Sequence, residues 1–233
     1  MPGWKDSPGS VGNLFKLFRN PEVDRGLAKI HPPQRLTRRS SGVGEFTRTI
    51  SGREGLWILD LGPTSATNIT LFTEKGHRVY TADLLTASQD PALMIPGEKG
   101  ESVIDVNGFL EENLKERGPV FDGVLCWDVA DYLPEALVKP VIGRLCSLIK
   151  PGGMLLAFFH TRDAGTDAPH FCYSLTGSDV LEMRSTTARS GSGPGFRLQR
   201  VFNNRHIENL FHDFASLKFF LARDNFREVL ATR

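Results

Sequence analysis

The strongest constraint on the fold of this chain is an alternation of short apolar runs and helical segments that begins near residue 55. The first run, LWILDLG (56–62), ends in an acid and a glycine and shows no polar–apolar alternation. Such a run indicates a strand buried on both faces, as in a parallel sheet. SATNITLFTEKG then has helical spacing, and HRVYTADLL has the pattern of a second strand. Together these segments predict one βαβ unit of about 30 residues.

The alternation continues up to residue 160. ESVIDVNGF indicates a third strand and EENLKER a short helix, while residues 123–127 and MLLAFF indicate a fourth and a fifth strand. Pro134 suits the first turn of a longer helix, in which Pro140 predicts a kink or a restart. Strands that alternate with helices predict an α/β fold with a Rossmann-like, doubly wound and mostly parallel sheet.

The chain after residue 160 has a different pattern. FCYSL, VLEMR and RLQRV are short strand-like segments, and a Gly/Ser-rich loop separates the last two. We therefore expect residues 161–203 to form a small inserted β-element that covers the acceptor side of the sheet. NNRHIENLFHDF predicts a helix, and SLKFFLARDNFREVLAT predicts a terminal hairpin. Because a hairpin is antiparallel, one strand of the otherwise parallel sheet should run antiparallel.

Composition separates residues 1–54 from the predicted core domain, residues 55–233. Residues 1–50 carry nine Lys/Arg and four Asp/Glu, a surplus of +5 (9 − 4), whereas the whole chain carries only +1. We expect a basic N-terminal arm with short helices near residues 14–18 and 46–50. The arm is either a solvated tail, which we favour, or a contact for an anionic partner such as RNA.

Targeting signals and cysteine spacing indicate the cellular compartment and the state of the thiols. No apolar run is long enough to cross a bilayer, and the N-terminus has no signal-peptide core, so we expect a cytoplasmic protein. Cys126, Cys146 and Cys172 have no CxxC spacing and no histidine in ligand register. This pattern predicts reduced thiols and no structural zinc site.

A glycine and an acid, Gly62 and Asp83, follow the first two predicted strands. Gly62 allows a tight turn after the first strand, and the helix that follows points free N–H groups at the same crevice. Asp83 ends the second strand, 21 residues after Gly62 (83 − 62), which is close to the spacing of nucleoside-binding units. We therefore expect its carboxylate to accept hydrogen bonds from ribose hydroxyls.

The motifs DLGPTSATNI, ADLL, IDVNGF, VLCWDVADYLP and LIKPGGMLLAFF, in this order, resemble the class I S-adenosylmethionine (SAM)-dependent methyltransferase family. The resemblance covers roughly residues 55–160 and returns at the terminal hairpin. Asp60 and Gly62 match the acidic glycine-rich loop of the family, whereas Thr64 and Ala66 stand where that family has two further glycines.

The resemblance implies SAM as the cofactor and a role for each matched position. The methionine part of SAM would lie on the loop of Asp60, Gly62, Pro63, Thr64 and Ser65, and Asn68 would either reach the cofactor or bond locally. Ribose would be held by Asp83 with Leu84 beside it, adenine by Asp105 and the Val106 backbone, and the amino end by Cys126, Trp127 and Asp128. From the residues alone, Trp127 is equally a core aromatic, and Asp128 and Asp131 are equally helix caps.

The reaction implied by the resemblance moves the sulfonium methyl to an acceptor, mainly by alignment and desolvation. A base is needed only if the acceptor must lose a proton. His160 at the end of the fifth strand and His170 on the following loop are candidates, and Tyr132 and Asp128 are weaker ones. We expect a small-molecule acceptor. A nucleic acid is the alternative, although the amino-directed (D/N)PPY motif is absent.

Two other functions fit parts of the sequence. A nucleotide-binding Rossmann oxidoreductase would need a full GxGxxG and a Tyr-x-x-x-Lys set, and the sequence contains neither. A non-catalytic methyltransferase-like protein that binds a partner would explain why Thr64 and Ala66 replace glycines.

Overall fold

The computed structural model describes residues 35–161, 170–186, 196–221 and 226–233. One compact unit runs from Pro33 to Arg233, and the helix expected near residues 14–18 lies outside the described residues. Within the described ranges, no helix combines the length and the apolar character needed to cross a bilayer.

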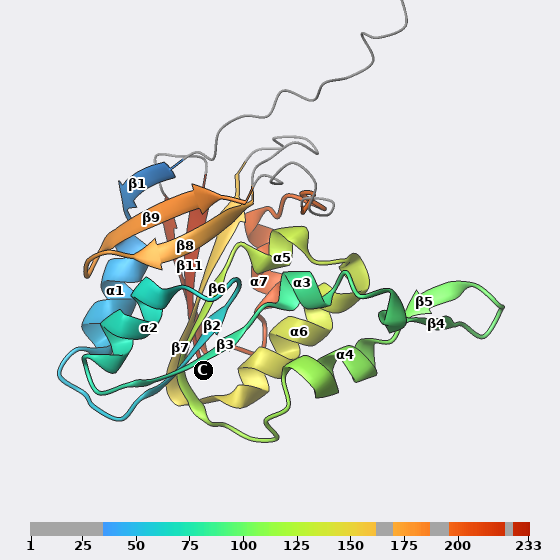
Figure 1. Cartoon of the computed structure of the whole chain (residues 1–233), viewed down its shortest axis with the longest axis horizontal. Helices are drawn as coiled ribbons and strands as arrows, with labels where there is room; N and C mark the ends of the chain where they lie inside the picture. The colour runs from blue at the N-terminus through green and yellow to red at the C-terminus, as the bar shows by residue number, and fades with distance from the viewer. Residues whose placement is uncertain (1–34, 162–169, 187–195, 222–225) are drawn as a thin grey trace, which may run out of the picture. The chain divides into compact units, whose positions relative to one another are not determined.

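A six-stranded sheet forms the centre of this unit (Figure 1). Its strands, in spatial order, are β10 (Ser216–Leu221), β11 (Phe226–Thr232), β7 (Ile149–His160), β6 (Phe121–Trp127), β2 (Trp57–Leu61) and β3 (Arg78–Ala82). The pairs from β7 to β3 are parallel, and β11 runs antiparallel between β7 and β10. The predicted Rossmann-like sheet with an antiparallel strand from the terminal hairpin is confirmed.

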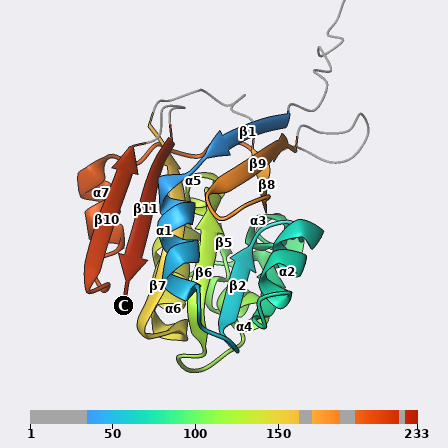
Figure 2. The same cartoon turned by 90° about the vertical axis from the view of Figure 1, so that its left-hand side faces the viewer.

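Helices cover both faces of the sheet (Figure 2). On one face lie α1 (Ser41–Ile50) and α2 (Ala66–Thr73), whose Phe46 and Phe72 are fully buried in a cluster with strand residues. The other face carries the helices α4 (Val106–Asn113), α6 (Glu135–Leu148) and α7 (Asn204–Leu210), which contribute to the larger apolar cluster. The α6 helix is a single element through Pro140, where we expected a kink or a restart.

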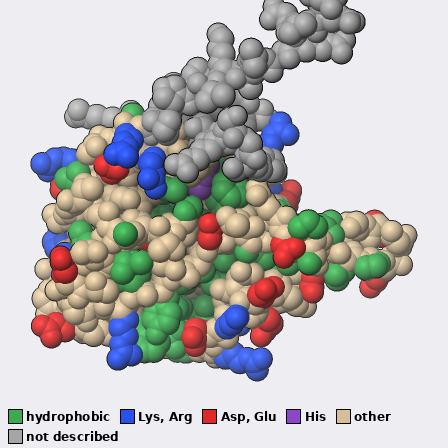
Figure 3. Space-filling view, in the orientation of Figure 1, with side chains coloured by type: hydrophobic (Ala, Val, Ile, Leu, Met, Phe, Trp, Pro, Cys, Tyr) green, Lys and Arg blue, Asp and Glu red, His purple; other side chains and the backbone are tan. Residues whose placement is uncertain are grey.

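The predicted third strand does not join the central sheet. Residues 102–104 form β5 (Ser102–Ile104), which pairs antiparallel with β4 (Met94–Pro96) in a separate hairpin after the short η1 (Pro91–Leu93). The apolar run is short, and Val106 already belongs to α4, so too few residues remain for a buried strand. The hairpin projects from the body, with hydrophobic side chains on its surface (Figures 1 and 3), and β3 forms the edge of the sheet.

The inserted β-element is a three-stranded antiparallel sheet. It contains β8 (Phe171–Leu175) and β9 (Val180–Ser185), as expected, and also β1 (Arg35–Arg39), which pairs with β9. The sequence did not predict β1 because RLTRR contains only one apolar side chain. The third expected strand, RLQRV, is described without regular secondary structure.

The N-terminal part of the described chain is integrated with the core. The segments β1 and α1, which the sequence analysis assigns to an arm, lie within the compact unit. The helix expected near residues 46–50 is the end of α1, and Ser40 caps its start by accepting a hydrogen bond from the Val43 N–H at 3.1 Å. Two short helices, α3 (Leu84–Ala87) and α5 (Val129–Tyr132), follow the ends of β3 and β6.

Candidate functional site

The turn after β2 and the end of β3 are neighbours. The Gly62 N–H donates to the Ala82 carbonyl at 2.9 Å, and Asp83 follows Ala82 directly. Gly62 has φ of 148°, a conformation in which a side chain would be strained. Parallel strands meet at this carboxyl edge, where open α/β sheets bind their ligands.

Asp60 is buried and is bonded within the protein. Its carboxylate accepts hydrogen bonds from Trp127 Nε1 at 2.6 Å and from Asn68 Nδ2 at 2.8 Å. Burial raises the pKa of Asp60, and these two hydrogen bonds offset part of that rise. The carboxylate therefore ties β2, α2 and β6 together and does not open onto solvent.

Asn68 joins the first loop to the inserted sheet. Its amide nitrogen also donates to the Tyr173 carbonyl at 3.1 Å, and its amide oxygen accepts from the Leu175 N–H at 2.7 Å. The side chain is fully buried. Of the two roles left open for Asn68, the structure places it in bonds to the protein, although they reach β8 as well as Asp60.

The two acids predicted to hold the adenosine part act as helix caps. Asp83 accepts hydrogen bonds from the N–H and the hydroxyl of Thr86, at 3.0 and 2.8 Å, and so caps α3. Asp105 caps α4 through the Gly108 N–H at 2.9 Å. A carboxylate has about four acceptor positions, so these caps leave acceptor capacity on both side chains.

The remaining predicted adenosine-side positions differ in accessibility. Val106 is half-buried at the start of α4, whereas the Leu84 side chain, at the start of α3, is fully buried. Leu84 can therefore offer a ligand only its backbone.

Trp127 ends β6 in a strained conformation. Its φ is 50°, which is rare for a bulky residue, and the pairing of β6 with β7 shifts register just before it. The indole stacks on the ring of Tyr173, with centroids 5.0 Å apart and an interplanar angle of 10°. Left-handed strain of this kind is about 1–3 kcal/mol and is held by surrounding contacts.

Asp128 lies directly beneath β8. Its Oδ2 accepts a hydrogen bond from the Tyr173 hydroxyl at 2.8 Å, while its Oδ1 is buried without a hydrogen-bond partner. His170 Nε2 lies 3.7 Å from Oδ1, beyond hydrogen-bond distance. Burial lowers the pKa of His170, although the charge of Asp128 opposes that shift.

The space between these groups is almost filled. Gly62, Pro63, Trp127 and Asp128 form one wall, and His170, Phe171 and Tyr173 form the other. The free volume is about 10 Å³, which is room for about one water molecule. The amino-acid part of SAM, which the sequence analysis places here, does not fit this arrangement.

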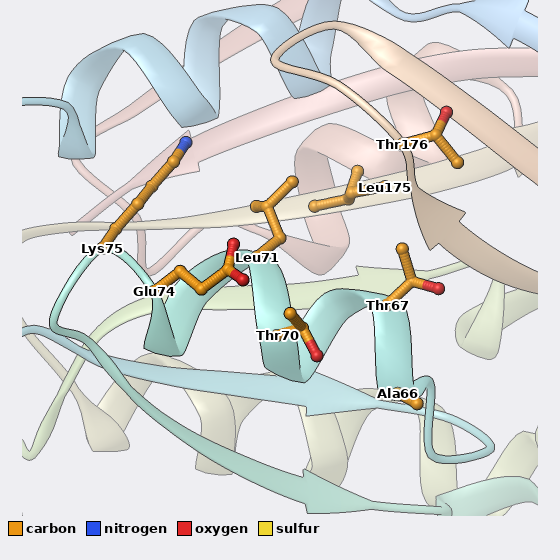
Figure 4. A pocket seen from close by; sticks show the side chains of 8 residues that line it. All are labelled: Ala66, Thr67, Thr70, Leu71, Glu74, Lys75, Leu175 and Thr176. Atoms are coloured by element: carbon orange, nitrogen blue, oxygen red, sulfur yellow. The ribbon is translucent and has the colours of Figure 1, made fainter.

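Two wider hollows lie outside this cleft. One, of about 620 Å³, runs between α2 and the turn after β8, with Leu71 and Leu175 at its centre and Lys75 at one end (Figure 4). The other, of about 770 Å³, lies along α1. Neither is lined by any residue of the predicted cofactor site.

A second polar pair lies at the end of β7. Asp131 Oδ2 accepts the His160 N–H at 2.7 Å and is 2.8 Å from His160 Nδ1. Burial alone would lower the pKa of His160, but the hydrogen bond and charge of Asp131 outweigh it and raise that pKa. Burial raises the pKa of Asp131 to about 6, against the effect of its bonds to His160.

Tyr132 connects the two histidines. Its ring lies edge-on to His160 and to His170, with centroids 5.7 and 5.0 Å away.

Asp131 is a hydrogen-bond partner of His160, a role that the sequence analysis missed because it treats Asp131 only as a cap. No local signal pairs these two residues, which are 29 positions apart.

Three other predicted positions have defined surroundings. Cys126 is completely buried, and burial raises its thiol pKa to about 12, which matches a core residue. Thr64 is exposed, whereas Ser65 caps α2 and lies 3.0 Å from the Ser174 hydroxyl of β8. In the described ranges, no group of three or more His, Cys, Asp or Glu side chains is placed to hold a metal ion.

Comparison with known proteins gives matches only among solved structures. No protein-family model and no curated protein matches the chain. The solved matches include a 1,6-didemethyltoxoflavin-N1-methyltransferase from Burkholderia thailandensis, with bound 1,6-didemethyltoxoflavin and S-adenosylhomocysteine. That match has 13% identity over 83% of this chain and 79% of that chain, with a TM-score of 0.42.

Two further matches are also SAM-dependent methyltransferases. A TehB-like enzyme from Corynebacterium glutamicum has 14% identity over 82% of this chain and 87% of its own, with a TM-score of 0.43. A protein from Methanosarcina mazei has 15% identity over 78% and 93%, with a TM-score of 0.44. At these values the matches are likenesses and assign no activity to this chain.

Proposed function

We propose that this chain is a SAM-dependent methyltransferase. The observation that carries the proposal is the contact between the Gly62 turn and the end of β3, which puts Asp83 beside the turn at the carboxyl edge of the sheet. The antiparallel β11 and the motif order in residues 55–160 support the same family. Asp83 retains acceptor capacity for ribose hydroxyls, and Asp105 for the adenine amino group.

We further propose that the acceptor is a small molecule. The polar groups near the cleft are enclosed by β8, and their described surroundings offer no open groove of the kind that follows a nucleic acid backbone. His160 is our candidate for the group that takes a proton from the acceptor, with Asp131 holding its Nδ1 side. Asp128 is the weaker candidate because the Tyr173 hydroxyl occupies its Oδ2.

The proposed ribose contact is tested by calorimetry. We expect the wild-type chain to bind an adenosyl ligand and Asp83→Ala to lose about 1–3 kcal/mol of that affinity, as for a removed charged acceptor. The control is Asp90→Ala, because Asp90 caps the neighbouring η1 in a similar way. Equal affinity of the wild type and Asp83→Ala for S-adenosylhomocysteine and for 5′-methylthioadenosine would refute the role of Asp83.

The filled cleft favours a second candidate function. A non-catalytic protein of this fold has no need of an open cofactor site, and Tyr173 and Phe171 occupy that place. This candidate predicts no binding of SAM, S-adenosylhomocysteine or 5′-methylthioadenosine to any variant. Binding of NAD instead of these ligands would point to the oxidoreductase.

A further inference from the structure

We propose that β8 occupies the amino-acid end of the cofactor cleft and is displaced when a complete adenosyl ligand binds, with Tyr173 as the closing residue. This inference rests on the proposed function. It assigns the inserted sheet a regulatory role at the same site: the chain itself competes with its ligand.

The contacts of β8 fall on the segments that the sequence analysis assigns to the methionine part of SAM. Tyr173 stacks on Trp127 and donates to Asp128. The backbone on both sides of Ser174 is bonded to the Asn68 amide. In this arrangement β8 makes the contacts that a ligand would otherwise make with the end of β6 and the start of α2.

One atom shows that these contacts are incomplete. Asp128 is fully buried and lines the cleft, yet its Oδ1 has no hydrogen-bond partner. A buried carboxylate oxygen without a donor is unfavourable. An ammonium or hydroxyl group of a ligand would supply the missing donor, whereas the Tyr173 hydroxyl serves only Oδ2. The closed arrangement is therefore not the best one available to Asp128.

The connectivity of β8 allows it to move. Among the described strands, β8 pairs only with β9 and forms the edge of the small sheet. Its displacement would break the contacts to Trp127, Asp128 and Asn68 and unpack the buried apolar side chains of β8, but it would break no ladder of the central sheet. The other edge strand, β1, is fastened separately, because Arg38 forms an ion pair with the buried Glu228.

Two ligands that differ only at the amino-acid end test the proposal. S-adenosylhomocysteine carries this end, and 5′-methylthioadenosine lacks it. If the closed state predominates, the apparent affinity for S-adenosylhomocysteine equals its affinity for the open state multiplied by the fraction of open chains. The affinity for 5′-methylthioadenosine, which does not need the open state, is not reduced. We expect Tyr173→Phe, which keeps the ring and loses the hydroxyl, to bind S-adenosylhomocysteine about tenfold more tightly than the wild type.

The matched variants separate the closing role from a general effect. We expect Tyr173→Ala to gain more affinity for S-adenosylhomocysteine than Tyr173→Phe does. The affinity for 5′-methylthioadenosine should be the same in the wild type and in both variants. The control Tyr80→Ala removes a ring that packs on Trp57 and Phe121 instead, and should change neither affinity. Equal affinity of the wild type and both Tyr173 variants for S-adenosylhomocysteine overturns the inference, as does an equal gain for both ligands.

A measurement on the wild type covers the case in which a Tyr173 variant fails to fold. Saturating S-adenosylhomocysteine should speed amide hydrogen exchange at residues 171–175, and 5′-methylthioadenosine should leave it unchanged. Slower or unchanged exchange with S-adenosylhomocysteine overturns the inference. If neither ligand binds any folded form, the proposed function itself has failed, which is a different outcome from binding that is indifferent to Tyr173.

Discussion

At the scale of single residues, the carboxylates near the carboxyl edge differ in what satisfies them. Asp60 receives a side-chain donor on each oxygen, whereas Asp131 receives the backbone N–H and the ring of His160 on Oδ2 alone and has a buried Oδ1 without a hydrogen-bond partner. Asp128 has a donor for only one of its oxygens. Hydrogen bonds that replace water stabilise buried carboxylates, and of these three only Asp128 lines the cleft, so its unpaired oxygen is the one that a donor in the cleft would meet.

The Asp131–His160 pair leads to a pH prediction. Asp128 and the rings of Tyr132 and Phe226 also face His160, but Asp131 provides the largest upward effect on its pKa. A histidine whose pKa is higher in the folded chain than its unfolded value of about 6.5 stabilises the fold below that pH. This stabilisation is lost as the pH rises through the folded pKa.

In Asp131→Asn, burial remains while the charge is gone, so the pKa of His160 should fall below about 6.5. The contribution of His160 should then reverse: it should favour the fold above that pH and be lost as the pH falls. A proton NMR titration of the His160 ring in the wild type and in the variant measures this pKa. An unchanged His160 pKa in this variant would contradict the assigned pairing.

At the scale of elements, α1 packs on the sheet through a glycine. The Phe46 ring is fully buried against β6, and a Cβ built on Gly123 would lie 2.6 Å from the Phe46 ring. A strand glycine is usually weakening because it offers no side chain. Here it provides the close approach between helix and strand, because the ring occupies the space that a side chain would need.

We therefore expect Gly123→Ala to destabilise the fold by about 1–3 kcal/mol, as for an overpacked core. The matched control is Gly143→Ala in α6, where an added Cβ meets nothing within 4 Å and the site is exposed. Because alanine favours a helix interior over glycine, this control should stabilise by about 0.5–1 kcal/mol. Denaturant unfolding measures both, and equal effects would show that the Phe46 contact is not limiting.

At the scale of the whole compact unit, the beginning of the described chain is fastened to its last strand. Glu228 of β11 is buried and pairs with Arg38 of β1. It also accepts the Ser40 hydroxyl at 2.9 Å and the Gly42 N–H at 2.6 Å. One carboxylate thus holds β1 and the start of α1 against the central sheet, and β1 in turn carries β9 and β8.

Neutralising the Glu228 carboxylate should lower the stability of the whole compact unit. We expect Glu228→Gln to reduce the free energy of unfolding by about 3–5 kcal/mol, because the charge of the half-buried Arg38 loses the opposite charge of Glu228. Asp179→Asn changes the same charge in the exposed pair with Arg39 and should stay within about 1 kcal/mol. Thermal and urea unfolding compare the two, and similar small losses in both variants would contradict an anchoring role for Glu228.

Particular segments show how far the sequence predicts this structure. The runs that became β2, β6 and β7 are mostly apolar and show no polar–apolar alternation, so their pattern indicated strands buried on both faces. The third apolar run was too short to show whether it would join the central sheet, and its residues form part of the β4–β5 hairpin instead. Gly62 and Asp83 were predicted as neighbours because parallel strands end at one edge, and the Gly62–Ala82 hydrogen bond agrees with that expectation.

The sequence by itself determined the alternation of elements, the parallel core and the antiparallel terminal strand, because local sequence patterns indicate burial on both faces and tight turns. Only the tertiary structure decided that β1 joins the inserted sheet, that Asp131 holds His160, and that Tyr173 lies on Trp127 and Asp128. These contacts join residues 29 to 149 positions apart (184 − 35 for the pairing of Arg35 with Arg184). No short-range periodicity encodes them, because they follow from how whole faces pack.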